Sequence, residues 1–210
     1  MGSSLQAPES GPRVTCWDGT SEATLEAALE PPATQCIEVG LAEKCKEDLD
    51  QAVEPGHLSL VVTTRSAYKH CIVKVFIHAM EHRTALTEDL RVRIYSAVQE
   101  ALMNAVLHGN LRIDPDTRGS LDGLVAAHDA IESKLKSSDV AQAPIRMDAL
   151  WDASQLRVLV HDSGVGYEPK AVQSRAGEDS MGRGLAILQA FSDNVAILDG
   201  GTTVELEFRL

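Results

Sequence analysis

Residues 96–110 read SAVQEALMNAVLHGN, and this stretch decides how the rest of the chain is interpreted. Glu100, Asn104 and His108 are spaced four residues apart. On a helix this spacing forms one polar line that drifts slowly around the axis, beside a largely apolar face. The stretch therefore predicts an amphipathic helix with its apolar side in the core.

The residues of this polar line could also take part in catalysis and metal binding. The Glu100 carboxylate could orient or deprotonate a nucleophile, as a general base does. The Asn104 side-chain oxygen suits magnesium, which takes oxygen ligands and keeps several waters. Because the same spacing is common on solvated helix faces, an ordinary exposed polar face stays open as the alternative.

Residues 158–166, VLVHDSGVG, form the second informative segment. An apolar strand leads into Asp162, and a carboxylate at a strand end can accept a hydrogen bond from an adenine amine. Gly164 and Gly166 let the backbone approach a ligand closely. An ordinary turn is the alternative.

Residues 181–188, MGRGLAIL, form the third segment. Gly182 and Gly184 precede an apolar helix, so free backbone amides there could meet phosphate oxygens, and Arg183 adds a cation. A glycine-rich helix start without a ligand is the alternative. The polar stretch 167–180 suits a mobile lid over a nucleotide, or else a surface loop.

Apolar patterning and turn residues predict the other elements. Thr87 begins the central helix, with Glu88 and Asp89 in its first turn, and Gly109 ends it. The stretch 68–80 suits a buried helix, although its β-branched residues leave a strand open. The expected strands are 14–18, 34–39, 57–63, 145–149, 156–161, 194–198 and 203–208, and the other expected helices are 21–30, 41–53, 121–136 and 182–192.

Composition excludes several classes of protein. The net charge of −12 argues against nucleic-acid binding and against an anionic membrane surface. No apolar run reaches membrane-spanning length, and the polar start of the chain does not resemble a signal peptide. The four cysteines form no CxxC motif, which favours reduced thiols in a cytoplasmic protein over a zinc site.

The three segments, taken in order, closely resemble the conserved boxes of the histidine-kinase-like (GHKL) ATPase superfamily. Glu100-x-x-x-Asn104 with His108-Gly109 resembles the N box, and Asp162-x-Gly164-x-Gly166 resembles the G1 box. Gly182-x-Gly184-Leu185 resembles the G2 box, and Gly201-Thr202 resembles the final box. The resemblance covers about residues 57–210, and the wording EALMNAVLHGN is most similar to anti-sigma-factor serine/threonine kinases.

The resemblance implies a fold and a site. The fold is an α/β (α+β) two-layer sandwich of the Bergerat type, a mixed sheet with helices on one face. Glu100 would be the general base for a protein hydroxyl, and Asn104 would ligate Mg²⁺. Asp162 would recognise the adenine of ATP, and Thr202 would support this contact through water. The implied nucleotide-lining residues are Asn104, His108, Asp162, Gly164, Gly166, Gly182, Arg183, Gly184, Leu185 and Thr202.

The implied function is an ATP- and Mg²⁺-dependent protein serine/threonine kinase in a bacterial partner-switching pathway. Its partners would be a small anti-anti-sigma-like signalling protein and a sigma factor, and a homodimer is left open. Residues 1–56 would be an accessory segment, with a small βαβα unit, ahead of an ATP-binding domain over 57–210. The stretch 111–147 would be an insertion in that domain.

Two other functions stay open. One is a non-catalytic module that senses ATP and regulates a partner. The other is the ATP-binding part of a histidine kinase, because Glu81-His82-Arg83-Thr84 resembles a phosphoacceptor segment. Only 17 residues separate His82 from Glu100, however, and no long dimerising helical hairpin fits there.

Overall fold

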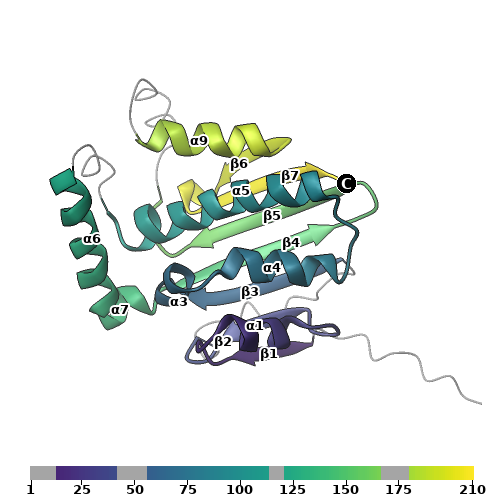
Figure 1. The fold of residues 1–210 in the computed structure, drawn as a ribbon, viewed down its shortest axis with the longest axis horizontal. Helices are drawn as coiled ribbons and strands as arrows, with labels where there is room; N and C mark the ends of the chain where they lie inside the picture. Colours follow the sequence, from purple (N-terminus) through teal and green to yellow (C-terminus); the bar gives the residue numbers. More distant parts are fainter. Residues whose placement is uncertain (1–12, 42–55, 114–120, 167–179) are drawn as a thin grey trace, which may run out of the picture.

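The computed structural model describes residues 13–41, 56–113, 121–166 and 180–210. Its centre is one seven-stranded mixed sheet with the strand order β1-β2-β3-β4-β5-β7-β6 (Figure 1). Strands β1 to β3 pair in parallel, and the remaining pairs are antiparallel. The strands are β1 (Val14–Trp17), β2 (Gln35–Glu38), β3 (His57–Thr63), β4 (Pro144–Trp151), β5 (Gln155–Asp162), β6 (Asn194–Leu198) and β7 (Thr203–Arg209).

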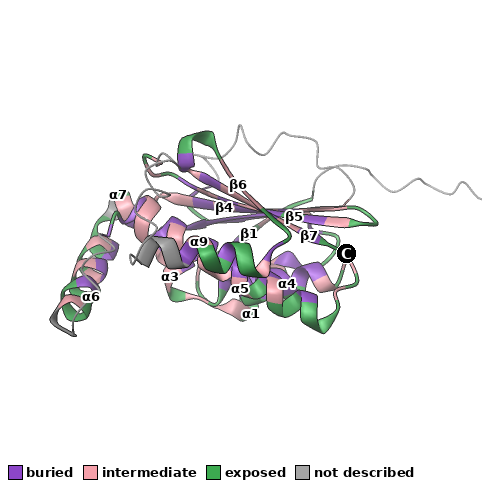
Figure 2. Ribbon diagram, turned by 90° about the horizontal axis from the view of Figure 1, so that it is seen from above, coloured by how far each residue is buried: buried purple, intermediate pink, exposed green. Residues whose placement is uncertain are grey.

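Helices cover one face of this sheet, which confirms the predicted fold class (Figure 2). Their apolar sides and the facing strand residues form the main core, as alternation along the strands requires. A smaller cluster of Ile37, Leu41 and Val61 is separate from that core. The helices are α1 (Glu22–Leu29), α3 (Thr64–Lys69), α4 (Ile72–Glu81), α5 (Glu88–Asn104), α6 (Leu121–Lys136), α7 (Ser138–Ala141) and α9 (Ser180–Phe191).

The sheet is continuous across the domain boundary expected at residue 57. β2 pairs with β3 from Gln35 opposite Ser59 to Ile37 opposite Val61, so the N-terminal strands extend the sheet of the larger part. The division into an accessory segment and an ATP-binding domain stays a prediction. The helix expected over 41–53 and the lid residues 167–179 lie outside the described residues.

Helix α5 begins where the sequence predicts. The hydroxyl of Thr87 accepts a hydrogen bond from the backbone N–H of Leu90 at 3.2 Å, which satisfies one free donor of the first turn. Glu88 and Asp89 follow in that turn, where the helix dipole favours negative charge. One face of the helix is buried, at Leu90, Ile94, Ala97, Val98, Ala101 and Leu102.

The predicted end of this helix at Gly109 is wrong. The chain continues beyond α5 as a π-helical segment, Ala105–Asn110, and the N–H of Leu111 donates to the carbonyl of Val106 at 2.9 Å. Gly109 is not in the left-handed conformation that a glycine cap uses. Its role is steric, because a Cβ at this position would collide with the side chain of Asp162.

Two further expectations need correction. The stretch 68–80 is helical, but it spans two helices, α3 and α4, which separate at His70 and Cys71. Helix α9 starts at Ser180, so Gly182 and Gly184 lie inside its first turns and do not precede it. Among the described residues, no helix combines the length and apolar character needed to cross a membrane.

The Thr87 cap gives a direct test of how α5 is anchored. We expect Thr87→Ala to lower the free energy of unfolding by about 1 kcal/mol, because the N–H of Leu90 loses its acceptor. Urea denaturation followed by circular dichroism measures the change. Ser96→Ala on the same helix is the control and should change stability by less than about 0.5 kcal/mol. Equal effects of the two variants would contradict the cap.

Candidate functional site

A cavity of about 160 Å³ lies between α5, its π-helical extension, α9 and the strands β5 to β7. Five residues predicted for the site line it: Asn104, His108, Asp162, Gly166 and Leu185. The remaining lining residues are small or apolar, and they are Ala101, Ala105, Gly109, Val160, Val165, Leu188, Ile197, Gly201 and Val204. An apolar cavity with a few converging polar groups is the usual form of a small-molecule site.

Asp162 is the buried carboxyl group of this cavity, with 8% of its surface exposed. It ends β5, and its backbone N–H donates to the carbonyl of Thr202 at 2.9 Å. Its Oδ1 accepts a hydrogen bond from the N–H of Gly164 at 2.7 Å. Burial raises the pKa of Asp162 above its usual value, against the opposing effects of the Gly164 N–H and of His161.

Glycines bring the backbone against this carboxyl. A Cβ on Gly109 would lie 2.4 Å from the Cγ of Asp162, and a Cβ on Gly164 would lie 2.6 Å from the carbonyl oxygen of Gly109. Gly166 has a φ of +70°, and a Cβ there would lie 2.2 Å from the carbonyl oxygen of Gly200. A side chain at 109 or 164 would separate the helix from the loop after β5, and one at 166 would separate that loop from the turn between β6 and β7.

Glu100 and Asn104 lie at the contact between α5 and α9. The side-chain amide of Asn104 donates to Oε1 of Glu100 at 3.3 Å. A Cβ on Gly184 would lie 2.6 Å from the same carboxylate oxygen, so α9 approaches α5 through a residue without a side chain. Asn104 reaches the cavity, whereas Glu100 is outside its lining and beside α9.

Gly182, Arg183 and Thr202 are outside the cavity lining, whereas His108 belongs to it. Gly182 belongs to the first turn of α9, and the side chain of Arg183 is outside the described part of the structure. The hydroxyl of Thr202 donates to the carbonyl of Asp199 at 3.1 Å, while its backbone carbonyl holds Asp162. The nitrogen Nδ1 of His108 lies 2.9 Å from the carbonyl oxygen of Ile113.

Asn110 is not among the residues predicted for the site. This residue is buried, and its side chain joins the π-helical segment to α3, to β4 and to the loop after β5. A polar residue at the end of an apolar helix was the one signal in the sequence. That signal does not reveal which backbone groups the amide would meet.

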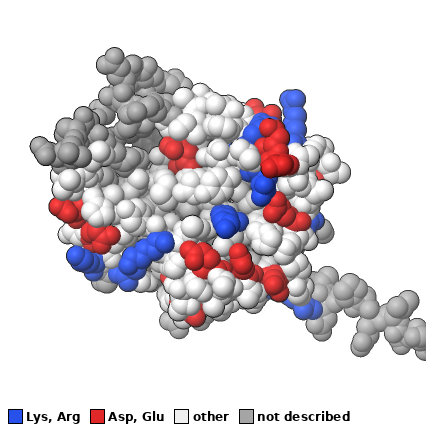
Figure 3. All heavy atoms as spheres, in the orientation of Figure 1, with Lys and Arg blue, Asp and Glu red and all other residues white. Residues whose placement is uncertain are grey.

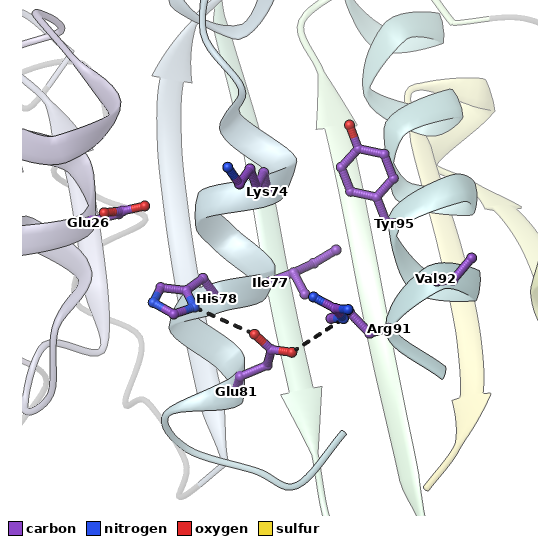
Figure 4. Close-up of a pocket in the computed structure, with 8 residues that line it drawn as sticks. All are labelled: Glu26, Lys74, Ile77, His78, Glu81, Arg91, Val92 and Tyr95. Carbon is purple, nitrogen blue, oxygen red and sulfur yellow. Dashed lines mark ion pairs between the residues drawn. The ribbon is translucent and has the colours of Figure 1, made fainter. Parts of the chain in front are cut away.

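A second cavity, of about 320 Å³, lies on the helical face between α1, α4 and α5 (Figure 4). Glu81 links its walls, with Oε2 3.5 Å from Nδ1 of His78 and Oε1 3.7 Å from Nε of Arg91. Carboxylates also gather over α1 on this face (Figure 3). None of the predicted site residues lines this cavity, so the smaller cavity is the candidate site.

The candidate site suits a flat, mostly apolar group that carries N–H donors. Asp162 supplies a carboxyl at one edge, and Asn104 supplies an amide at the α9 side. Among the described residues, no group of three or more His, Cys, Asp or Glu side chains is placed to hold a metal ion. A metal at Asn104 would therefore also need ligands from a bound molecule, which is how Mg²⁺ binds with phosphates.

Most of the chain matches a known protein family. Residues 68–208 match a family model described as the histidine kinase-like ATPase domain. The matched range contains every residue of the cavity. No curated protein matches the chain.

The raised pKa of Asp162 predicts a pH-dependent cost to stability. Burial disfavours the charged carboxylate in the folded state and raises its pKa above the value in the unfolded chain. Stability is therefore lost as the pH rises from the unfolded pKa through the folded pKa. We expect Asp162→Asn to be more stable than the natural chain at pH 7.5, by a margin that shrinks towards pH 4. Urea denaturation at both pH values measures the margin.

Asp193→Asn is the matched control of opposite sign. The N–H of Arg209 and the charge of Arg93 hold the pKa of Asp193 below its usual value. Its charged form therefore stabilises the fold above the unfolded pKa, and the variant should be less stable at pH 7.5. A destabilised Asp162→Asn protein at pH 7.5 would contradict the assignment of a costly buried carboxyl.

Proposed function

The chain belongs to the histidine kinase-like ATPase domain family, and from this premise we propose that it is a protein serine/threonine kinase. It would use ATP and Mg²⁺ and would act on a small signalling protein. The observation that carries the proposal is the Glu100–Asn104 pair, which lies beside an apolar cavity with a buried carboxyl at its other edge. That arrangement would supply a base, a metal ligand and a ring pocket together.

The adenine ring would occupy the cavity. Leu185, Leu188 and Val160 offer apolar contact to its faces, and Ala101 leaves room because its side chain is short. The Asp162 carboxylate would accept a hydrogen bond from the adenine amine. Thr202 would support this contact through water, in addition to accepting a hydrogen bond from the backbone N–H of Asp162 at its carbonyl.

The phosphates would extend towards the start of α9. The first N–H groups of a helix lack partners within the helix and point at bound anions, and Gly182 lies in that turn. Arg183 would add a positive charge. The amide nitrogen of Asn104 is engaged by Glu100, which leaves its oxygen as the end suited to Mg²⁺. The metal would neutralise phosphate charge.

The chemical step is a transfer of the γ-phosphoryl group. The oxygen of a serine or threonine hydroxyl attacks the γ-phosphorus, and the bond from that phosphorus to the β,γ-bridging oxygen breaks. ADP leaves, and the hydroxyl proton passes to the Glu100 carboxylate. The products are ADP and a phosphoprotein.

The chain's own histidine is a poor acceptor in this arrangement. His82 caps the end of α4, and only the connection 82–87 separates α4 from α5. Helix α4 has 10 residues, which is short for a dimerising hairpin. This geometry favours a hydroxyl on another protein over His82 as the acceptor.

The proposed partners follow the resemblance to anti-sigma-factor kinases. The substrate would be a small anti-anti-sigma-like protein, a sigma factor would be a second partner, and the chain would act in the cytoplasm. A homodimer is part of the same proposal. The net charge of −12 supports partners other than nucleic acid and anionic membranes.

A transfer assay tests the proposed activity. The chain is incubated with γ-labelled ATP, Mg²⁺ and candidate anti-anti-sigma-like proteins, and we expect acid-stable label on a serine or threonine of the partner. Tight ATP binding without transfer would favour the ATP-sensing module. Acid-labile label retained on the chain itself would favour the histidine kinase.

The Glu100→Gln variant separates binding from chemistry in that assay. It removes the base but keeps the shape, so ATP affinity should change little while transfer falls by about 10²- to 10⁴-fold. Asp162→Asn is the matched comparison, and it should weaken ATP binding measured by calorimetry. Unchanged transfer by Glu100→Gln would contradict the base assignment.

A further inference from the structure

Both polar groups of the Asn110 side chain, the oxygen and the amide nitrogen, make hydrogen bonds. Its Oδ1 accepts a hydrogen bond from the backbone N–H of Ser163 at 2.8 Å. Its Nδ2 donates to the hydroxyl of Thr64 at 2.7 Å and to the carbonyl of Pro144 at 3.3 Å. With 8% of its surface exposed, this amide is a buried link between three separate segments.

The Asn110 side chain holds Ser163, the residue that follows Asp162. The three successive N–H groups of Asp162, Ser163 and Gly164 each have a different acceptor. These acceptors are the carbonyl of Thr202, the side chain of Asn110 and the Asp162 carboxyl itself. Thr202, which precedes β7, thus holds the backbone of Asp162, and Asn110 of the π-helical segment holds the backbone of Ser163.

The hydroxyl of Ser163 adds to the same arrangement. It donates to the carbonyl of Pro144 at 2.9 Å, and that carbonyl also accepts from Asn110. The π-helical geometry of Ala105–Asn110 sets where Asn110 points, since it changes the turn per residue after α5. The loop that begins at Asp162 is therefore oriented by the segment that also carries His108 and Gly109.

We propose that Asn110 is a positioning residue that sets the Asp162 carboxyl against the edge of the adenine ring. Asn110 is outside the cavity lining, so it acts through Ser163 and not by touching the nucleotide. The inference rests on the proposed function, because it assumes that Asp162 reads the adenine amine. It adds a residue that determines base specificity.

The test compares two nucleotides that differ at the amine. Inosine triphosphate has a carbonyl oxygen where adenine has the amine, so it cannot donate to Asp162. We expect the natural chain to bind ATP at least about tenfold more tightly than inosine triphosphate, because the lost hydrogen bond involves a charged group. Calorimetry with each nucleotide and Mg²⁺ measures both affinities.

Asn110→Ala should reduce this discrimination. We expect ATP binding to weaken by about tenfold, while binding of inosine triphosphate stays within about twofold. A residue with a merely structural role would weaken both nucleotides equally. Equal weakening, or unchanged discrimination in a folded variant, would overturn the proposal.

Thr64→Val keeps the proposal testable if Asn110→Ala does not fold. It removes the hydroxyl that holds the Asn110 amide, and discrimination should fall in the same direction by a smaller factor. Thr15→Val is the control, because its hydroxyl also makes hydrogen bonds within the fold, to the carbonyls of Ala28 in α1 and Gln35 in β2, but it lies on β1 away from the cavity. Loss of discrimination in the control as well would overturn the proposal.

The natural chain separates this inference from the proposed function. If it binds ATP and inosine triphosphate equally, the adenine role of Asp162 fails, and the role of Asn110 fails with it. If it discriminates and Asn110→Ala discriminates equally well, only the inference about Asn110 fails.

Discussion

The space that Gly109 leaves for the Asp162 carboxyl is the constraint around which the site is built. A Cβ would lie 2.4 Å from the Cγ of Asp162, so the helix and the end of β5 approach each other only through glycine. The close approach explains why a glycine stands inside a helix, where it costs stability relative to alanine. It also places the neighbouring His108 on the cavity and Asn110 on Ser163.

Burying Asp162 costs free energy, and the surrounding structure offsets only part of it. The Gly164 N–H favours the charged carboxylate, but desolvation is the larger effect and raises the pKa. A costly carboxyl in an otherwise apolar cavity is typical of a site kept for binding, because stability alone would favour a neutral residue. The same reasoning accounts for glycines at 164 and 166, where a Cβ would meet the backbone of Gly109 and of Gly200.

Helices α6 and α7 are connected to the same site by hydrogen bonds. Arg65 of α3 donates to the carbonyl of Leu135, and Lys134 donates to the carbonyl of Leu111. Thr64, beside Arg65, is the residue whose hydroxyl accepts from Asn110. Helices α6 and α7 are therefore anchored through α3 to the groups that orient the loop after β5.

Local patterns in the sequence determined the elements and the order of the three glycine-containing segments. The start of α5 at Thr87 and the strand that ends at Asp162 follow from caps and apolar periodicity, which act between near neighbours. The fold class came from the resemblance of the three segments to a known superfamily. Only the tertiary structure decided that Gly109 is a point of contact and not a helix end, and that Glu100 lies beside Gly184 and outside the cavity. It also decided the hydrogen-bond partners of Asn110, which are 34 to 53 residues away in the chain. Periodicity specifies which side of a helix is buried, but the partner of each buried group depends on how distant segments pack.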